Sequence, residues 1–298
     1  MKSILSLFVA AIFWGLNFHF IKFMFEESAY AEAGVWRYAL ATLTMVVMSV
    51  GAMRKWKISQ VPWKGVLLVG AIGLLGFNLA VYVGMQYTSA LNASLIMSLN
   101  PVTTILFSSL ILKTEARWYH FLGAAISFVG VLLLISQGQL LSLQSLRFNK
   151  GDLLVFVGNL VFAFYHIGVK QFKKDTPNLQ FTAYTNFVCM LGFMLIIPLT
   201  PAEIRLNHSA EYWTWALLLA VVGTAISFML WNYGVTQIGA DRAGIFMNVV
   251  PLATAISALF FGLEVQAYHL YSGLTIIMGI VLTQAASYWT HRKKRERR

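Results

Sequence analysis

The sequence predicts an all-α polytopic membrane protein with ten transmembrane helices, arranged as two inverted five-helix repeats. Composition is the first indication, because 58% of the 298 residues are hydrophobic and only 11% are charged, whereas about a quarter of the residues in a soluble domain are charged. The second is a long stretch of sequence that occurs twice, and the third is the placement of basic residues between apolar stretches. The composition alone excludes an ordinary soluble domain.

Ten apolar stretches have the length, about 20 residues, that crosses the hydrocarbon core of a bilayer. In the first half they are Ile4–Met24, Ala31–Met53, Trp63–Tyr87, Leu91–Leu112 and Tyr119–Ser136. In the second half they are Asp152–Gln171, Leu179–Leu199, Trp213–Thr236, Ala243–Leu263 and Tyr268–Trp289. The first stretch follows a lone lysine, as in a signal peptide, but it is long enough to span the membrane and no small-residue cleavage site follows it. We therefore expect it to remain as the first membrane helix.

The stretch from Tyr82 to Gly130 occurs again between Asn232 and Gly279. Its landmarks keep their spacing to within one residue. The matching pairs are Gly84 with Gly234, Pro101 with Pro251, Glu115 with Glu264, Tyr119 with Tyr268 and His120 with His269. Self-similarity at so long a period indicates a duplicated half rather than a solenoid of short repeats. The chain is therefore divided into a first five-helix repeat (1–138), a connecting loop (139–150), a second five-helix repeat (151–290) and a basic cytoplasmic tail (291–298).

Basic residues gather on one side of the predicted bundle. In a soluble protein the formal net charge of +11 would suggest nucleic acid, but here the basic residues follow the even-numbered spans. They are Arg54, Lys55, Lys57, Lys64, Lys113, Arg117, Lys173, Lys174, Arg242 and the tail HRKKRERR. The positive-inside rule then places both termini in the cytoplasm. Since five crossings are an odd number, the second half enters the membrane inverted, as in carriers that open a midplane site to each side in turn.

Three groups of residues resemble those of a known transporter family. They are FWGLNFHFIK in the first apolar stretch, RYALA in the second, and the duplicated stretch with its Pro, Glu and Gly landmarks. On these motifs the chain resembles the EamA family of the drug/metabolite transporter superfamily over nearly its whole length. The resemblance implies ten spans in a bacterial inner membrane, both termini in the cytoplasm, and export of amino acids or other metabolites. The second half has LVFAFYHIGVK in place of IFWGLNFHFIK and no counterpart of Arg37, so functional roles are expected to be asymmetric.

Two prolines lie near the middle of the fourth and ninth stretches. Pro101 and Pro251 each lack an N–H and free the carbonyl four residues back, at Met97 and Met247. In lipid such a carbonyl must be satisfied inside the protein. The prolines therefore mark either broken helices that line a substrate path or packing kinks, and the presence of both favours the broken helices. Small residues at helical spacing, including Gly123 and Ser127, predict close helix packing.

Polar and aromatic side chains at membrane depth form the predicted substrate site. An amide there costs energy unless it is hydrogen-bonded, so these side chains should face the interior of the bundle. Each one alone is more simply explained as a tie between helices. Together they predict an amphipathic cavity for a small solute with polar and apolar parts. The predicted substrate-binding residues are Trp14, Asn17, His19, Asn78, Tyr82, Tyr165, His166, Trp231 and Asn232.

Four charged residues, together with Pro101 and Pro251, are predicted to act in gating. Lys22 lies near the end of the first stretch, from where its long side chain could extend to the interface. Arg37 could bind a substrate carboxylate through two hydrogen bonds, or take a structural or gating role, which is slightly favoured. Glu115 and Glu264 are expected on opposite membrane faces. There they could latch two gates, cap helices or pair with nearby cations.

Several kinds of chemistry have no sequence signal. No Asp or Glu lies at the centre of a stretch, which argues against a proton relay through a buried carboxylate. His19 and His166 could titrate near neutral pH, so proton-coupled, uncoupled and exchange transport all stay open. The chain lacks catalytic motifs such as H-E-x-x-H and G-x-S-x-G, and its single cysteine, Cys189, lies in an apolar run. We therefore predict no catalytic residues, no metal and no cofactor.

The sequence thus predicts a secondary transporter that exports a small metabolite, such as an amino acid or related amphipathic solute, by alternating access. The alternatives are an intramembrane enzyme and a membrane receptor that transports nothing. The expected partners are a small-molecule substrate and the lipid bilayer, not nucleic acid, and the features above are compatible with a monomer. The expected location is a bacterial cytoplasmic membrane.

Overall fold

A computed structural model describes residues 2–51, 58, 61–88, 93, 96–139, 141, 149–257 and 266–296. Within these residues all regular structure is helical and no strand occurs. Seven helical segments are long and apolar enough to cross a membrane, and shorter apolar segments run through Lys2–Asn17 and Asn100–Ile111. The protein is therefore an all-helical, multi-pass membrane protein. The count of ten spans stays a prediction.

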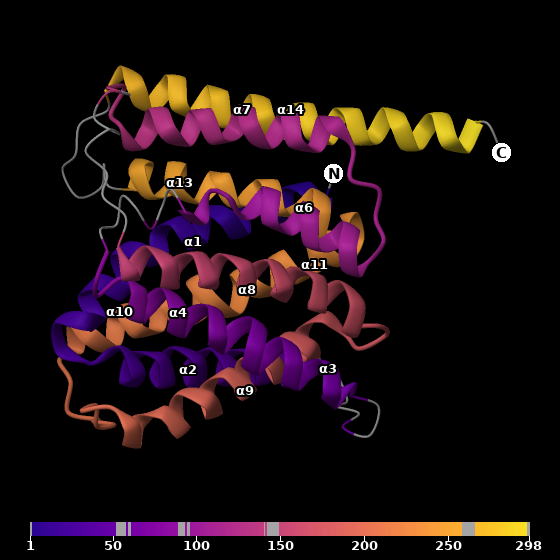
Figure 1. The fold of residues 1–298 in the computed structure, drawn as a ribbon. Coiled ribbons are helices and arrows are strands. Elements are labelled where there is room, and N and C mark those ends of the chain that lie inside the picture. Colours follow the sequence, from indigo (N-terminus) through magenta and orange to yellow (C-terminus); the bar gives the residue numbers. More distant parts are fainter. Residues whose placement is uncertain are drawn as a thin grey trace.

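The helices form one bundle in which most axes run roughly alongside one another (Figure 1). The first half contains α1 (Lys2–Glu27), α2 (Tyr30–Gly51), α3 (Trp63–Leu67), the π-helix η2 (Leu68–Gly76), α4 (Phe77–Gly84), α6 (Asn100–Ile111) and α7 (Trp118–Ile135). The second contains α8 (Lys150–Phe172), α9 (Asn178–Ile196), the 3-10 turn η4 (Ile197–Leu199), α10 (Ala210–Ala220), the π-helix η5 (Val221–Ile226), α11 (Ser227–Ile238), α12 (Ala240–Ala243), the 3-10 helix η6 (Gly244–Asn248), α13 (Val249–Ser257) and α14 (Ala267–Glu296). The start of α1 and the end of α14 lie on the same side of the bundle (Figure 1).

Both predicted helix breaks lie immediately before their prolines. Ser98 and Leu99 form a turn, and α6 begins at Asn100. Pro101 therefore occupies the first turn of a helix that begins near the middle of the predicted span, and there its missing N–H has no intrahelical acceptor to lose. Pro251 is likewise in the first turn of α13, directly after η6.

Asn159 on α8 satisfies the backbone that the first break exposes. Its fully buried side chain donates from Nδ2 to the carbonyl oxygens of Ile96 at 2.7 Å and Met97 at 3.3 Å. Its Oδ1 accepts a hydrogen bond from Thr103 Oγ1 at 2.7 Å. The Met97 carbonyl, which Pro101 leaves without a backbone donor, is thus satisfied inside the protein, as predicted.

Helices α7 and α14 pack against each other along one side of the bundle (Figure 1). Gly123 approaches Gly279 and Gly130 approaches Ile276, so the two helices are antiparallel. A Cβ added at Gly279 would lie only 2.4 Å from the Gly123 carbonyl oxygen and 2.8 Å from Ser127 Cβ. The predicted close packing at Gly123 and Ser127 is confirmed. Antiparallel packing of the fifth and tenth predicted spans supports the inverted repeat, which itself stays a prediction.

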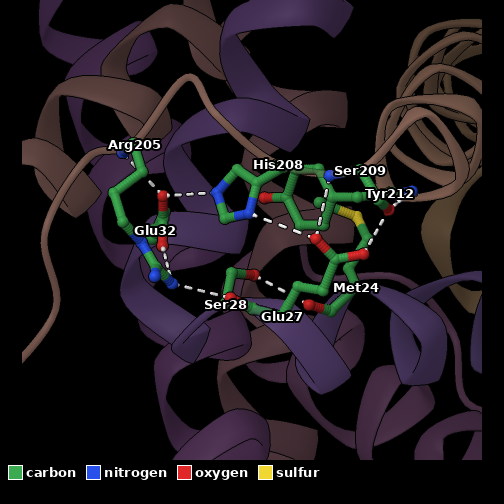
Figure 2. A network of polar contacts seen from close by, with 8 residues as sticks. All are labelled: Met24, Glu27, Ser28, Glu32, Arg205, His208, Ser209 and Tyr212. Carbon is green, nitrogen blue, oxygen red and sulfur yellow. Dashed lines mark hydrogen bonds and ion pairs between the residues drawn. The ribbon is translucent and has the colours of Figure 1, made fainter.

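A network of polar contacts attaches the turn between α1 and α2 to the segment before α10 (Figure 2). The buried carboxylate of Glu32 lies 2.8 Å from His208 Nε2 and accepts a hydrogen bond from the Arg205 backbone N–H at 2.8 Å. Arg205 Nη2 donates to the Glu27 carbonyl at 2.7 Å, and the Ser209 backbone N–H donates to Glu27 Oε2 at 3.0 Å. This network joins the two halves of the chain at one end of the bundle.

Glu27 is expected to make this attachment sensitive to acid. Hydrogen bonds from the Ser209 side chain and backbone, and then the neighbouring His208, hold the pKa of the Glu27 carboxyl below its ordinary value of 4.5. A group whose pKa is lower in the folded state stabilises the fold above its ordinary pKa, and it loses that contribution as the pH falls through the folded value. We therefore expect Glu27→Gln to lower Tm near neutral pH, and the difference from wild type to shrink below about pH 4.

Thermal unfolding in detergent across this pH range measures the effect. Glu26→Gln is the matched control, because Glu26 is the exposed neighbour on the same helix. A Tm difference for Glu27→Gln that stays constant with pH, or that equals the difference for Glu26→Gln, would contradict the assignment.

Candidate functional site

A cavity of about 460 Å³ lies between helices of both halves of the chain. This volume falls within the roughly 300–1,000 Å³ typical of ligand pockets. The aromatic and polar residues that line it are Trp14, Asn17, Arg37, Phe77, Asn78, Tyr82, Ser98, Gln137, Phe162, Phe228, Thr254, Tyr268 and His269. The rest of the wall is mainly aliphatic. Its chemistry is therefore that of an apolar pocket with a few polar groups.

Aromatic rings from both halves build one wall of the cavity. The indole of Trp14 on α1 lies 5.6 Å from the ring of Phe162, 5.1 Å from Phe228 and 4.7 Å from Trp231, measured between centroids. Phe77 on α4 stacks on Phe162 at 4.3 Å. Such contacts hold large side chains in one arrangement. The cluster therefore presents a shaped apolar surface to the cavity.

The guanidinium of Arg37, on α2, is the main polar feature of the wall. It is buried, donating from Nε to Thr224 Oγ1 at 2.8 Å and from Nη1 to Tyr82 Oη at 2.8 Å and Asn78 Oδ1 at 3.3 Å. Asn78 is oriented in turn, because its Nδ2 donates to Tyr38 Oη at 2.8 Å. The guanidinium is thus held in a fixed position by three neutral acceptors.

The π-helix η5 supplies two of the polar contacts at this site. Thr224 Oγ1 donates to the Leu219 carbonyl at 2.9 Å, five residues back, and accepts from Arg37. The Gly223 carbonyl accepts a hydrogen bond from Asn17 Nδ2 at 2.8 Å. π-helical turns frequently occur at functional sites because they change which backbone groups are paired. Sequence reasoning missed Thr224, since a threonine beside a glycine in an apolar helix is no specific signal.

Two polar atoms at the cavity have no hydrogen-bond partner in the described part of the chain. They are the indole Nε1 of Trp14, a donor, and the side-chain Oδ1 of Asn17, an acceptor. Leaving a buried polar atom unpaired costs about 1–3 kcal/mol. Both atoms are buried within the wall, so a bound molecule can reach them only if these side chains turn toward the cavity.

The structure brings some of the predicted substrate-binding residues together and not others. Trp14, Asn17, Asn78 and Tyr82 line the cavity, as do Arg37 and Pro251 of the predicted gating group. Substrate binding by these residues stays a prediction. The side chains of His19 and Lys22, and all of Glu264, lie outside the described residues.

Four predicted substrate-binding residues are not among those that line the cavity. Tyr165, His166, Trp231 and Asn232 are fully buried behind its wall. Tyr165 Oη donates to Asn232 Oδ1 at 2.8 Å, and Asn232 Nδ2 donates to Thr182 Oγ1 at 3.0 Å. The polar groups of Tyr165 and Asn232 tie α8, α9 and α11 together, which was the simpler explanation for such residues, whereas Trp231 Nε1 and His166 Nε2 have no partner among the described residues. A role of these four residues in substrate binding stays a prediction, and in this structure they lie behind the cavity lining.

The remaining gating candidates, Pro101 and Glu115, also lie away from the cavity lining. Glu115 is largely exposed and forms an ion pair with Arg117, whose Nε donates to Glu115 Oε2 at 3.0 Å. This hydrogen bond raises the pKa of Arg117. The geometry matches the expected alternative, a carboxylate that pairs with a nearby cation.

A model of the EamA-like transporter family matches residues 1–136 and again residues 149–284. The chain belongs to the EamA-like transporter family. This EamA-like transporter is 29% identical over 279 residues to YyaM, an uncharacterized transporter of Bacillus subtilis, with 91% of this chain and 90% of the relative covered. The resemblance to the EamA family is therefore confirmed.

Two further relatives have more specific names. The EamA-like transporter is 21% identical over 286 residues to a probable terminal-alkyne amino-acid exporter of Streptantibioticus cattleyicolor, covering 94% of this chain and 93% of the relative. It is 25% identical over 230 residues to a biotin transporter of Escherichia coli, covering 76% and 73%. A solved crystal structure shares the fold, with a TM-score of 0.82 at 15% identity over 97% of this chain and 98% of the other.

Proposed function

We propose that this EamA-like transporter exports a small amphipathic metabolite, such as an amino acid or a related solute, across a bacterial cytoplasmic membrane by alternating access. The cavity is the observation that carries the proposal, because it combines an aromatic wall with a few fixed polar groups inside a membrane-spanning bundle. The names of the relatives, which include an exporter and a biotin transporter, support a metabolite-sized solute. The direction of transport follows the family resemblance.

Two hydrogen bonds beside the cavity support a rocking of one half against the other. Arg37 bonds to Thr224, and Asn17 bonds to the Gly223 carbonyl, so each bond joins the first half to the second. A relative rotation of the halves would alter both bonds and thus change the polar wall that the solute contacts. This is the coupling between binding and conformation that alternating access needs.

The cavity extends toward one end of the bundle. It includes Gln137, just after α7, and Tyr268 and His269 at the start of α14. In the predicted topology this end faces the outside of the cell, and so does the network around Glu32 and His208. The conformation described here is therefore the proposed outward-reaching state, in which a solute would leave for the exterior.

The transport proposal predicts flux through proteoliposomes and its dependence on the cavity wall. Vesicles containing the purified protein should move a labelled solute from a panel of hydrophobic amino acids and biotin faster than empty vesicles. Trp14→Phe keeps a ring in the wall but reduces the aromatic surface available to the solute, so we expect it to lower the flux by about 2–10-fold.

Trp118→Phe is the matched control, because the side chain of Trp118 is 73% exposed and lies outside the cavity. Wild-type flux no greater than that of empty vesicles would overturn the transport function. Equal flux for the two variants would overturn the assignment of Trp14 to the solute site.

A further inference from the structure

Arg37 is a buried cation without an anionic partner among the described residues. Its side chain contacts the hydroxyls of Thr224 and Tyr82, the amide of Asn78 and the ring of Tyr38, with the guanidinium carbon 5.2 Å from the ring centroid. All four groups are neutral. The ion pairs found in the described part of the chain involve Arg117, Arg205 and His208, and none reaches Arg37. The positive charge is thus positioned but not compensated.

An uncompensated charge at this depth has a physical cost. Arginine stays protonated in proteins, and buried charges are normally paired with an opposite charge or exposed to water. The hydrogen bonds above come from Nε and Nη1, whereas Nη2 donates to no described residue. Because Arg37 lines the cavity, a solute in the cavity can supply both the missing charge and an acceptor for Nη2.

We propose that the transported solute is a small organic monocarboxylate with an apolar body, and that its carboxylate binds Arg37. The proposal rests on the transport function above and specifies the class of solute at that same site. A carboxylate is the planar anion that matches a guanidinium, and its hydrogen bonds to arginine are charge-assisted. Besides Arg37 the described lining residues include no Lys or Arg and the wall is mainly apolar, which favours a single anionic group and disfavours polyanions.

The rest of the cavity wall fits a solute that has a carboxylate at one end and an apolar body. Trp14, Phe77, Phe162 and Phe228 provide an apolar surface for the body of the molecule. The Oδ1 of Asn17 is unpaired but buried, so it can receive an N–H or O–H group only if this side chain turns toward the solute. An α-amino acid with a large apolar side chain satisfies all three features, and so does a carboxylic acid with an amide or ureido N–H.

A purely structural Arg37 is the rival explanation, because its bond to Thr224 joins the two halves. A structural role predicts that loss of Arg37 weakens the fold without changing which ligands bind. A role in solute selection predicts a change in the preference for acids over uncharged analogues. The ratio of two affinities on one protein therefore separates the two roles.

The test measures equilibrium binding to the purified full-length protein by titration calorimetry. The probes are pairs of a carboxylic acid and its primary amide, namely leucine, phenylalanine and biotin with leucinamide, phenylalaninamide and biotinamide. The amide keeps the shape of the acid and removes the negative charge. We expect at least one acid to bind wild type about tenfold or more tightly than its amide, since charge-assisted hydrogen bonds are the strong ones.

Arg37→Gln should reduce this acid-to-amide ratio to near one. Arg37→Lys, which keeps the charge, should retain a preference for the acid. Lys64→Gln removes an exposed positive charge outside the cavity lining and should leave the ratio unchanged. If Arg37→Gln does not fold, the wild-type ratio and the Arg37→Lys ratio still decide the outcome.

Three results would overturn the proposal: no acid in the panel that binds wild type more tightly than its amide, an acid preference that persists in Arg37→Gln, or no binding by any member of the panel. Flux in proteoliposomes distinguishes this failure from failure of the transport function. If the protein transports solute without preferring acids, only the proposed role of Arg37 is refuted. If acids bind through Arg37 but no flux occurs, only the transport function is refuted.

Discussion

Replacing Asn159 with leucine is expected to destabilise the folded protein by about 3 kcal/mol. Leucine fills a similar volume but removes the donor to the carbonyls of Ile96 and Met97 and the acceptor for Thr103. A buried carbonyl that loses its donor costs about 1–3 kcal/mol, and Pro101 cannot replace the bond because it has no N–H. The break before α6 should therefore lose its internal support.

Thermal or denaturant unfolding in detergent measures this loss. Leu153→Ala is the control, because Leu153 lies on the same helix with a 65% exposed side chain, and substitutions at such positions change stability little. Unfolding of Asn159→Leu at the wild-type midpoint would show that the carbonyls before Pro101 do not depend on Asn159.

Transport should fall at least tenfold when Gly223 becomes alanine. A Cβ at this position would lie 1.7 Å from Asn17 Oδ1 and 2.9 Å from Asn17 Nδ2, so the Asn17 side chain must move. It then loses its bond to the Gly223 carbonyl and its place in the cavity wall. The loss of one well-placed polar contact, together with the displacement of a residue in the cavity wall, accounts for a fall in flux of this size.

Gly76→Ala provides the matched control. Gly76 also belongs to a π-helical segment in a membrane span, but a Cβ there would meet its nearest neighbour, Val161, at 3.4 Å. Alanine also has a higher helix propensity than glycine, so neither substitution should destabilise the helix backbone. Wild-type flux in Gly223→Ala would exclude Asn17 from the solute site.

The sequence was sufficient to predict the membrane class, the family and the positions of the helix breaks. Apolar length identifies a membrane span because the bilayer sets it. Proline identifies a break because its missing N–H is a local property of the chain. For the same reason, the need to satisfy the Met97 carbonyl could be predicted, although Asn159 as its donor could not.

The membership of the cavity wall could not be predicted in the same way. Tyr82 and Asn78 line the cavity whereas Tyr165 and Asn232 lie behind it, yet the residue types are the same. The face of a helix that reaches a cavity depends on packing against its neighbours. Helices that are apolar on most sides carry little periodic signal for that face.

Contacts between distant segments were also missed. Glu32 and His208 lie far apart in the chain, and their pairing depends on how the segment before α10 lies over the turn between α1 and α2 (Figure 2). The same holds for Arg37 and Thr224. Arg37 was singled out as a charge at membrane depth, but its partners became visible only in three dimensions.

The most direct test of an inverted, alternating-access carrier is the sidedness of three single cysteines in intact cells. They are introduced at Lys2, at Gln139 and after the last residue, and they are labelled with a membrane-impermeant thiol reagent. Native Cys189 is fully buried and provides the background. The account predicts that Gln139→Cys reacts from outside, and that the other two react only after the membrane is permeabilised. Labelling of all three from the same side would contradict it.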